Sequence, residues 1–162
     1  MSHATGWTGW LEGTALAVAM RQWAWLYPIT EIAHIVGFAV LVGAAIMFDL
    51  RLLGVSSQLP VIGMARHLLP WARASLVLVI PSGLMMFTAH ADEFAGNPVF
   101  RLKLALLATA GLNAAVFHQW SFGSVARWDR EVGAPWPAKV SAILSLVLWP
   151  SVISCGRLLA YF

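Results

Sequence analysis

The sequence predicts an all-α membrane protein, a transmembrane four-helix up-down bundle preceded by an N-terminal interfacial helix. Its 162 residues are 60% hydrophobic and only 10% charged, whereas soluble domains carry roughly 25% charged residues. Four apolar stretches each approach the roughly 20 residues that cross a bilayer. Short connections join these stretches and favour antiparallel neighbours. We therefore interpret residues 1–162 as a single membrane domain.

The interfacial helix is expected over about residues 7–25. Glu12 and Arg21 make this segment a poor fifth span. Tryptophan rings favour the depth of the lipid headgroups. Four of them stand near the two ends of the segment: Trp7, Trp10, Trp23 and Trp25.

The four spans are expected over about residues 28–50, 65–90, 98–122 and 139–159. Basic residues are more frequent in and beside the first and third connections, which hold Arg51, Arg66, Arg73, Arg127, Arg130 and Lys139. The opposite side holds Arg21, Arg101, Lys103 and Arg157. Cytoplasmic loops of membrane proteins carry the excess of Lys and Arg. We therefore expect the first and third connections in the cytoplasm and both termini outside (N-out/C-out).

Four histidines fall within or at the ends of three spans, where ionisable side chains are costly and need a partner or a function. His34 lies about 9 Å below the outer entry of the first span, at 1.5 Å per residue. His90 ends the second span on that outer side, while His67 begins it on the inner side and His118 lies near the inner end of the third span. The histidines thus form an outer pair, His34/His90, and an inner pair, His67/His118.

Two histidine pairs at two depths are what two stacked bis-histidine haem groups require. Neutral imidazole is a good axial ligand of haem iron and brings no negative charge into lipid. We therefore expect haem b, with His34, His90, His67 and His118 as axial ligands of the iron. Basic side chains at the rims are candidates for the haem propionates, and among them we single out Arg73 and Arg101 as cofactor-binding residues.

A simpler interpretation competes with each histidine ligand. A single membrane histidine more often makes hydrogen bonds between helices or at the interface than it binds a metal. His67 follows Arg66 and suits an inner surface, while His90 precedes Asp92 and suits an outer loop. The side chain of Arg73 is as consistent with extension to the lipid headgroups as with binding a haem propionate.

Four sequence blocks carry a family resemblance: HIVG, DLRLLG, LPW and NPVFRLK. With them, the chain resembles an uncharacterised bacterial family of small four-helix membrane proteins. It is also similar in plan to the cytochrome b561-type and copper-resistance D-type proteins, whose four-helix cores bind haem b through histidines. The familiar pair of ligand histidines about fourteen residues apart on one helix is absent, and the fourth span has no histidine. The haem count is therefore two or one.

The leading hypothesis is a haem b electron-transfer component of the bacterial cytoplasmic (inner) membrane rather than a stand-alone enzyme. It would exchange electrons between a quinone and an outer-side redox protein, or anchor a larger oxidoreductase complex in the membrane lipid. The alternative is a non-redox membrane subunit or a small copper transporter, in which the histidines bind metal or brace helices. No basic run suggests a nucleic-acid partner, and Cys155, the single cysteine, allows no iron–sulfur cluster.

Overall fold

The computed structural model describes residues 6–121, 123, 125, 128, 129, 133–159 and 161. Within these ranges the chain is helical and has no strand. Four helices are long and apolar enough to cross a membrane: Leu26–Leu52, Val61–Ala89, Pro98–Trp120 and Trp136–Leu158. The expected all-α structure with four candidate spans is thereby confirmed, and these apolar helices suggest a multi-pass membrane protein. Arg127 and Arg130, which entered the charge comparison, lie outside the described residues.

The long helices begin and end within a few residues of the expected boundaries. They are α3 (Leu26–Leu52), α4 (Val61–Ala89), α6 (Pro98–Val116) and α7 (Trp136–Leu158). A π-helical turn, η1 (Phe117–Ser121), continues α6. The connection expected over 91–97 instead contains a short helix, α5 (Ala91–Gly96). The side chain of Asn97 ends this connection by accepting from the backbone N–H of Val99 at 2.8 Å, which starts α6.

The N-terminal segment was expected to be one helix over 7–25, and this is wrong in detail. The structure has two short helices, α1 (Trp7–Glu12) and α2 (Ala15–Gln22). The break occurs at Thr14, whose backbone is extended and whose side chain accepts from the N–H of Ala17 as the N-cap of α2. The Thr14 hydroxyl also donates to the carbonyl of Leu11 at 2.7 Å. A capping threonine thus ends one helix and begins the next.

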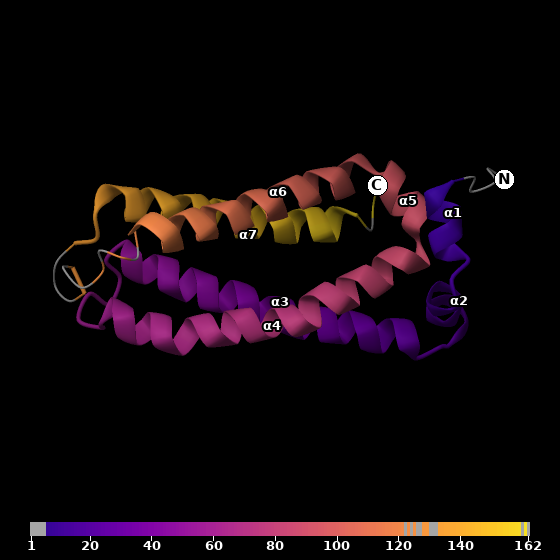
Figure 1. Cartoon of the computed structure of the whole chain (residues 1–162), viewed down its shortest axis with the longest axis horizontal. Helices are drawn as coiled ribbons and strands as arrows, with labels where there is room; N and C mark the ends of the chain where they lie inside the picture. The colour runs from indigo at the N-terminus through magenta and orange to yellow at the C-terminus, as the bar shows by residue number, and fades with distance from the viewer. Residues whose placement is uncertain are drawn as a thin grey trace.

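The four long helices form two antiparallel pairs, α3 with α4 and α6 with α7 (Figure 1). The pairs meet through α3 and α7. Helices α1, α2 and α5 lie across one end of the molecule, here called the capped end, and the α3–α4 connection lies at the other, the loop end. Among the described residues, no Cα atom of α4 lies within 8 Å of one in α6. Backbone packing therefore leaves α4 and α6 apart.

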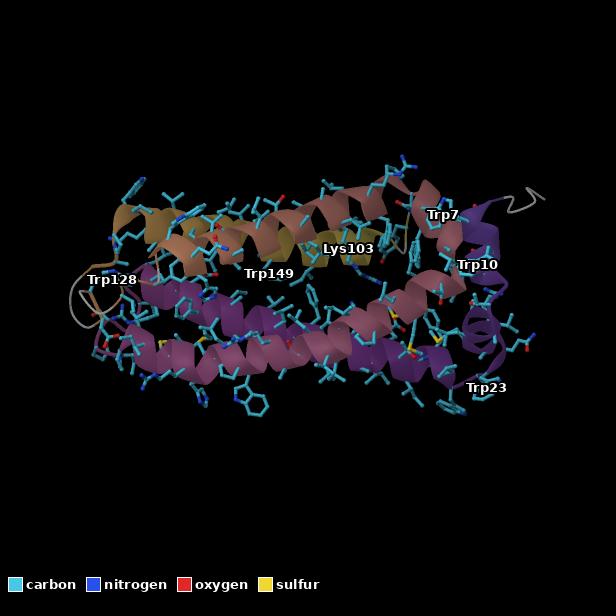
Figure 2. All side chains as sticks on the ribbon, in the orientation of Figure 1. Trp7, Trp10, Trp23, Lys103, Trp128 and Trp149 are labelled. Carbon is cyan, nitrogen blue, oxygen red and sulfur yellow. The ribbon has the colours of Figure 1, made fainter. Side chains whose placement is uncertain are left out.

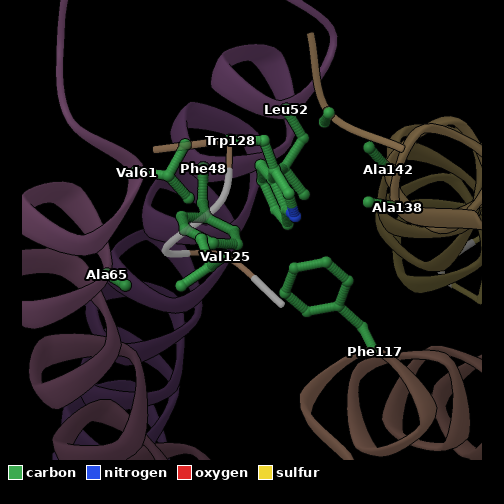
Figure 3. Packing of buried hydrophobic residues seen from close by; sticks show 10 residues of the cluster. Phe48, Leu52, Val61, Ala65, Phe117, Val125, Trp128, Ala138 and Ala142 are labelled. Atoms are coloured by element: carbon green, nitrogen blue, oxygen red, sulfur yellow. The ribbon is translucent and has the colours of Figure 1, made fainter. Parts of the chain in front are cut away.

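Side-chain contacts join the two helix pairs at both ends of the molecule. At the loop end, Phe48 and Phe117 meet edge to face with ring centroids 5.7 Å apart, in a cluster with Leu52 and Val61 (Figure 3). At the capped end, Phe87 of α4 stacks on Phe100 of α6 at 5.5 Å. These two aromatic contacts define the ends of the interior in which the candidate site lies.

The outer surface has the character of a lipid-facing one. Large apolar side chains are exposed along the middle of the helices, for example Ile32, Val77 and Leu112. Most exposed tryptophans lie toward the two ends, as the labelled Trp10 and Trp23 show at the capped end (Figure 2), whereas Trp71 is exposed within α4. Apolar flanks with tryptophans near the ends are typical of a membrane environment.

Candidate functional site

The candidate site is centred on His34, a half-buried residue in the seam between α3 and α4. Glycines on both helices make this position possible. A Cβ atom at Gly37 would lie 2.9 Å from the Cβ of Leu78, so glycine lets α3 approach α4 closely. A Cβ atom at Gly83 would lie 3.1 Å from Cε1 of His34, so a glycine here leaves room for the imidazole.

Hydrogen bonds fix the tautomer of His34. Its Nδ1 lies 3.1 Å from the carbonyl oxygen of Val79 and 3.0 Å from Oγ of Ser82. A carbonyl oxygen only accepts, and the Ser82 hydroxyl donates its proton to the carbonyl of Leu78. Nδ1 must therefore carry the imidazole proton and donate it to both oxygens. The other nitrogen, Nε2, keeps a free lone pair and has no hydrogen-bond partner among the described residues.

Aromatic rings extend the site from His34 toward the second helix pair. Phe38 stacks on the His34 ring with centroids 6.1 Å apart. Phe38 in turn meets Trp149 of α7 edge to face at 5.8 Å. These contacts create a low-dielectric lining beside the imidazole and connect α3 with α7.

Lys103 brings a positive charge to the same interior. Its side chain points from α6 into the space between the helix pairs (Figure 2), and its charge acts on His34. A Cβ atom at Gly156 would lie 3.6 Å from Nζ of Lys103, so a glycine in α7 accommodates the ammonium group. The part of the chain that the structure describes forms no hydrogen bond or ion pair with Lys103. An ammonium group at membrane depth without a carboxylate partner is able to bind an anionic group.

His90, expected to pair with His34, lies nearer the capped end. It follows the last residue of α4, and its ring meets Tyr27 at 5.8 Å and Phe94 at 6.1 Å. Its Nδ1 is buried and has no hydrogen-bond partner among the residues that the structure describes. Tyr27 precedes His34 by seven residues, which corresponds to roughly 10 Å along a helix. The two imidazoles therefore contact different residues at different depths.

The two histidines at the loop end belong to different helix pairs. His67 of α4 lines a groove of about 260 Å³ together with Met47, Met64 and other residues of the α3–α4 pair. His118 lies in η1 at the end of α6, where its ring meets Phe117 edge to face at 5.5 Å. The charge of Arg73 acts on His118.

The two arginines singled out for the cofactor bind backbone carbonyls. Arg73 is exposed, and its Nε donates to the carbonyl of Leu69 one turn earlier at 3.4 Å. Arg101 donates from Nε and Nη2 to the carbonyl of Ala95 in α5, at 3.1 and 2.9 Å. Both arginines are therefore engaged by carbonyls, whereas the side chain of Lys103 points into the space between the helix pairs (Figure 2).

Comparison with known proteins gives one match. Residues 7–162 match DUF6644, a family of unknown function. The chain belongs to this family. No curated protein and no solved structure matches it. Membership of DUF6644 thus assigns no activity, and a functional argument has to rest on the site itself.

The hydrogen bonding of His34 in this DUF6644 chain has the form found at many ligating histidines. A ligating histidine usually donates its second ring N–H to a carbonyl or carboxylate, which fixes the tautomer and orients the ring. The bond from His34 to Val79 has this form. The contacts of His90 place no second imidazole opposite His34. Within the described residues, no group of three or more His, Cys, Asp or Glu side chains is arranged to hold a metal ion.

Sequence reasoning singled out His34 but missed the residues that orient it. Ser82 and Gly83 follow Pro81 within an otherwise apolar run of α4. A small polar residue beside a glycine in a span signals close helix packing. The Ser82-Gly83 pair therefore predicts that α4 packs closely against another helix, but it does not predict that the contact is with His34 of α3.

Proposed function

We propose that the chain is a haem b-binding electron-transfer protein of the bacterial cytoplasmic membrane, acting as a component of a larger oxidoreductase system rather than as a stand-alone enzyme. The proposal includes an up-down bundle, N-out/C-out orientation and an interfacial position of α1 and α2. The observation that carries it is the tautomer of His34. Its Nδ1 proton is held by Val79 and Ser82, and its Nε2 lone pair is free.

The proposed role of each residue follows from its contacts. His34 would hold the haem iron through Nε2, while the bond to Val79 would keep the ring orientation and raise the basicity of the imidazole. Lys103 would bind a propionate, because it is the cation that faces this interior without a carboxylate partner. Phe38 and Trp149 would exclude water. Haem supplies the one-electron redox centre when bound, and burial tunes its potential.

The geometry favours one haem at His34 over two stacked groups. His90 lies about two helical turns from His34 along α3, and His67 faces a groove of the α3–α4 pair. Electron exchange with a quinone and with an outer-side redox protein remains part of the proposal. It rests on the membrane character of the helices and on the charge comparison.

A second candidate function is a non-redox membrane subunit in which the histidines brace helices. The favouring observation is that His34 bridges α3 and α4 by hydrogen bonds. Interhelical hydrogen bonds of this kind are common between membrane helices without any cofactor. A copper-transporting role belongs to the same alternative.

A reduced-minus-oxidised absorption spectrum separates these candidates. We expect the purified protein, expressed with sufficient haem, to show the α-band of a b-type cytochrome. His34→Ala should abolish this band, because the axial nitrogen is lost. His67→Ala is the matched control and should keep it, because His67 lines a groove away from the interior.

The spectra of the wild type and of the variants distinguish the haem protein from the non-redox subunit. A folded but colourless wild-type protein would overturn the haem proposal and favour the bracing role. Elemental analysis of that colourless protein for copper tests the transporter alternative. A folded His34→Ala variant that keeps the α-band would exclude His34 as the ligand. Thermal unfolding of every variant shows whether a lost band reflects a lost fold.

A further inference from the structure

A small cavity at the loop end is unrelated to the His34 site. It has a volume of about 90 Å³, well above the roughly 10–15 Å³ that one water molecule needs. Its lining combines two cations with small residues and contains no acidic side chain within the described part of the chain. It is lined by Arg51, Leu52, Leu53, Gly54, Ser57, Gly133, Ala134 and Lys139.

Arg51 is held rigidly in the wall of this cavity. Its side chain is only 3% exposed. Nε donates to the carbonyl of Leu59 at 2.6 Å, and Nη2 donates to the carbonyls of Ser57 and Asp129 at 2.9 and 3.1 Å. A guanidinium group has five N–H donors, so these bonds leave the two on Nη1 unused. Arg51 lines the cavity, and its two Nη1 donors have no hydrogen-bond partner among the described residues.

Two further positive features meet Arg51 at the cavity. Lys139 lies in the first turn of α7, and its Nζ would be 3.7 Å from a Cβ atom built at Gly133. The cavity also adjoins the N-terminus of α7, which begins at Trp136. A helix N-terminus carries partial positive charge, so it favours anions. At this N-terminus the dipole acts alone, because Pro135 and Pro137 have no N–H and the N–H groups of Ala138 and Lys139 donate to the carbonyl of Pro135. The guanidinium of Arg51, the ammonium of Lys139 and the dipole of α7 therefore all favour a negatively charged group in the cavity.

The level of the cavity along the bundle indicates which anions reach it. Trp136 stands beside it and is 72% exposed, and Trp120 near the same end is 73% exposed. Exposed tryptophans favour the headgroup region of a bilayer. Basic pockets between helices at this depth bind the headgroups of anionic lipids.

We propose that the cavity between Arg51, Lys139 and the start of α7 binds a phosphate group. This group belongs either to an anionic phospholipid headgroup or to free phosphate. Arg51 contributes the two Nη1 donors in the pre-set planar geometry that suits phosphate oxygens. Lys139 contributes a movable charge at the mouth. The site does not depend on haem.

The test measures binding to the full-length protein in a neutral detergent. Short-chain phosphatidylglycerol, short-chain phosphatidylcholine and inorganic phosphate are titrated separately and followed by calorimetry. Phosphatidylglycerol should bind, and phosphatidylcholine should bind at least about tenfold more weakly, because its headgroup has no net negative charge. Lys139→Gln should weaken phosphatidylglycerol binding by about tenfold, the loss typical of one charge-assisted hydrogen bond.

Matched variants keep the test independent of folding. Gly133→Asp places a carboxylate beside Nζ of Lys139 and should abolish binding, whereas the neutral Gly133→Asn should largely retain it. Arg66→Gln removes a charge from an exposed position of α4 that does not line the cavity, and should leave binding unchanged.

Each outcome has a defined meaning. Binding of inorganic phosphate as tight as that of phosphatidylglycerol assigns the site to free phosphate, and binding of phosphatidylglycerol alone assigns it to a lipid headgroup. The proposal is overturned if neither binds the wild-type protein. It is equally overturned if Arg66→Gln weakens binding as much as Lys139→Gln, since the effect would then be one of overall charge.

Discussion

His34 of α3 donates its Nδ1 proton to the carbonyl oxygen of Val79 on α4 across 3.1 Å. The two residues are 45 positions apart in the chain, yet this bond determines which ring nitrogen of His34 has a free lone pair. A carbonyl within a helix still has a second lone pair for a side-chain donor. The bond therefore joins the two helices without breaking the helical hydrogen bonds of α4.

Replacing Ser82 tests how the surroundings of His34 tune the site. In Ser82→Ala, Val79 still accepts the Nδ1 proton, so we expect the haem b α-band to persist. The imidazole loses one of its two acceptors and becomes a weaker electron donor, so the midpoint potential should rise by an amount on the order of tens of millivolts. Redox titration monitored at the α-band measures the shift.

Ser75→Ala is the control for this variant. Ser75 is buried in the same helix and donates to the carbonyl of Ala72, and it makes no hydrogen bond with His34. The midpoint potential of the Ser75→Ala variant should match that of the wild type. Equal potentials in Ser82→Ala and the wild type would contradict the tuning of the site by the Ser82 hydroxyl.

Gly37→Ala should destabilise the protein. The new Cβ atom would lie 2.9 Å from Cβ of Leu78, 3.0 Å from Cγ2 of Val79 and 3.2 Å from the carbonyl oxygen of Ser75. Overpacking of this kind costs about 1–3 kcal/mol, which exceeds the gain of up to about 1 kcal/mol from replacing a helical glycine by alanine. Thermal unfolding in detergent should show a lower midpoint.

Gly43→Ala in the same helix is the matched control, because nothing lies within 4 Å of its added Cβ atom. Its midpoint should be equal to or above that of the wild type. A Gly37→Ala variant as stable as Gly43→Ala would show that α3 and α4 do not pack as closely as described.

Asn113 and Ser141 should be energetically coupled across α6 and α7. Asn113 Nδ2 donates to the carbonyl of Ser141 at 2.9 Å, and the Ser141 hydroxyl donates to Asn113 Oδ1 at 3.0 Å. Such interhelical bonds contribute about 0.6 kcal/mol on average and up to about 1.7 kcal/mol in a membrane protein. A double-mutant cycle with Asn113→Ala and Ser141→Ala, measured by unfolding, should give a coupling energy in this range for the hydroxyl bond, since the bond to the Ser141 carbonyl is kept in Ser141→Ala. Additive effects would exclude the hydroxyl bond.

Arg21→Ala should loosen the helices at the capped end. Arg21 donates to the carbonyl of Ala89 at 2.9 Å and to the carbonyl of Glu12 at 2.6 Å, so it holds α1 and α2 on the end of α4. Hydrogen–deuterium exchange of residues 7–22 should become faster, while exchange in α7 should not change. Arg157→Ala, at a residue bonded to Tyr161 near the C-terminus, should leave the exchange of residues 7–22 as it is.

Much of the secondary structure followed from local patterns, and the exceptions are instructive. The run from Leu26 to Leu52 is apolar over more than the thickness of a bilayer core, and it is one helix. The break at Thr14 escaped prediction because tryptophans at both ends of the segment suggested a continuous interfacial helix. A Gly-Thr pair inside an amphipathic stretch is the local signal for such a break.

The candidate site was harder to predict. Depth along the helices placed His34 and His90 on the same side of the membrane, but depth alone does not fix what each ring contacts. In the structure His90 meets Tyr27 and Phe94, while His34 meets Val79 and Ser82. Helix rotation separates them, and rotation depends on how the glycine-lined seam of α3 and α4 packs.

The amino-acid sequence by itself determined the class of protein. A chain with so few charges has to satisfy its backbone polar groups within helices in an apolar solvent, and four runs have the length to do so. Only the tertiary structure decided which groups meet, such as Lys103 with the surroundings of His34 or Arg51 with the carbonyl of Asp129. The physical reason is that apolar helices insert through their own composition, whereas their mutual rotation is selected by close packing at a few small residues.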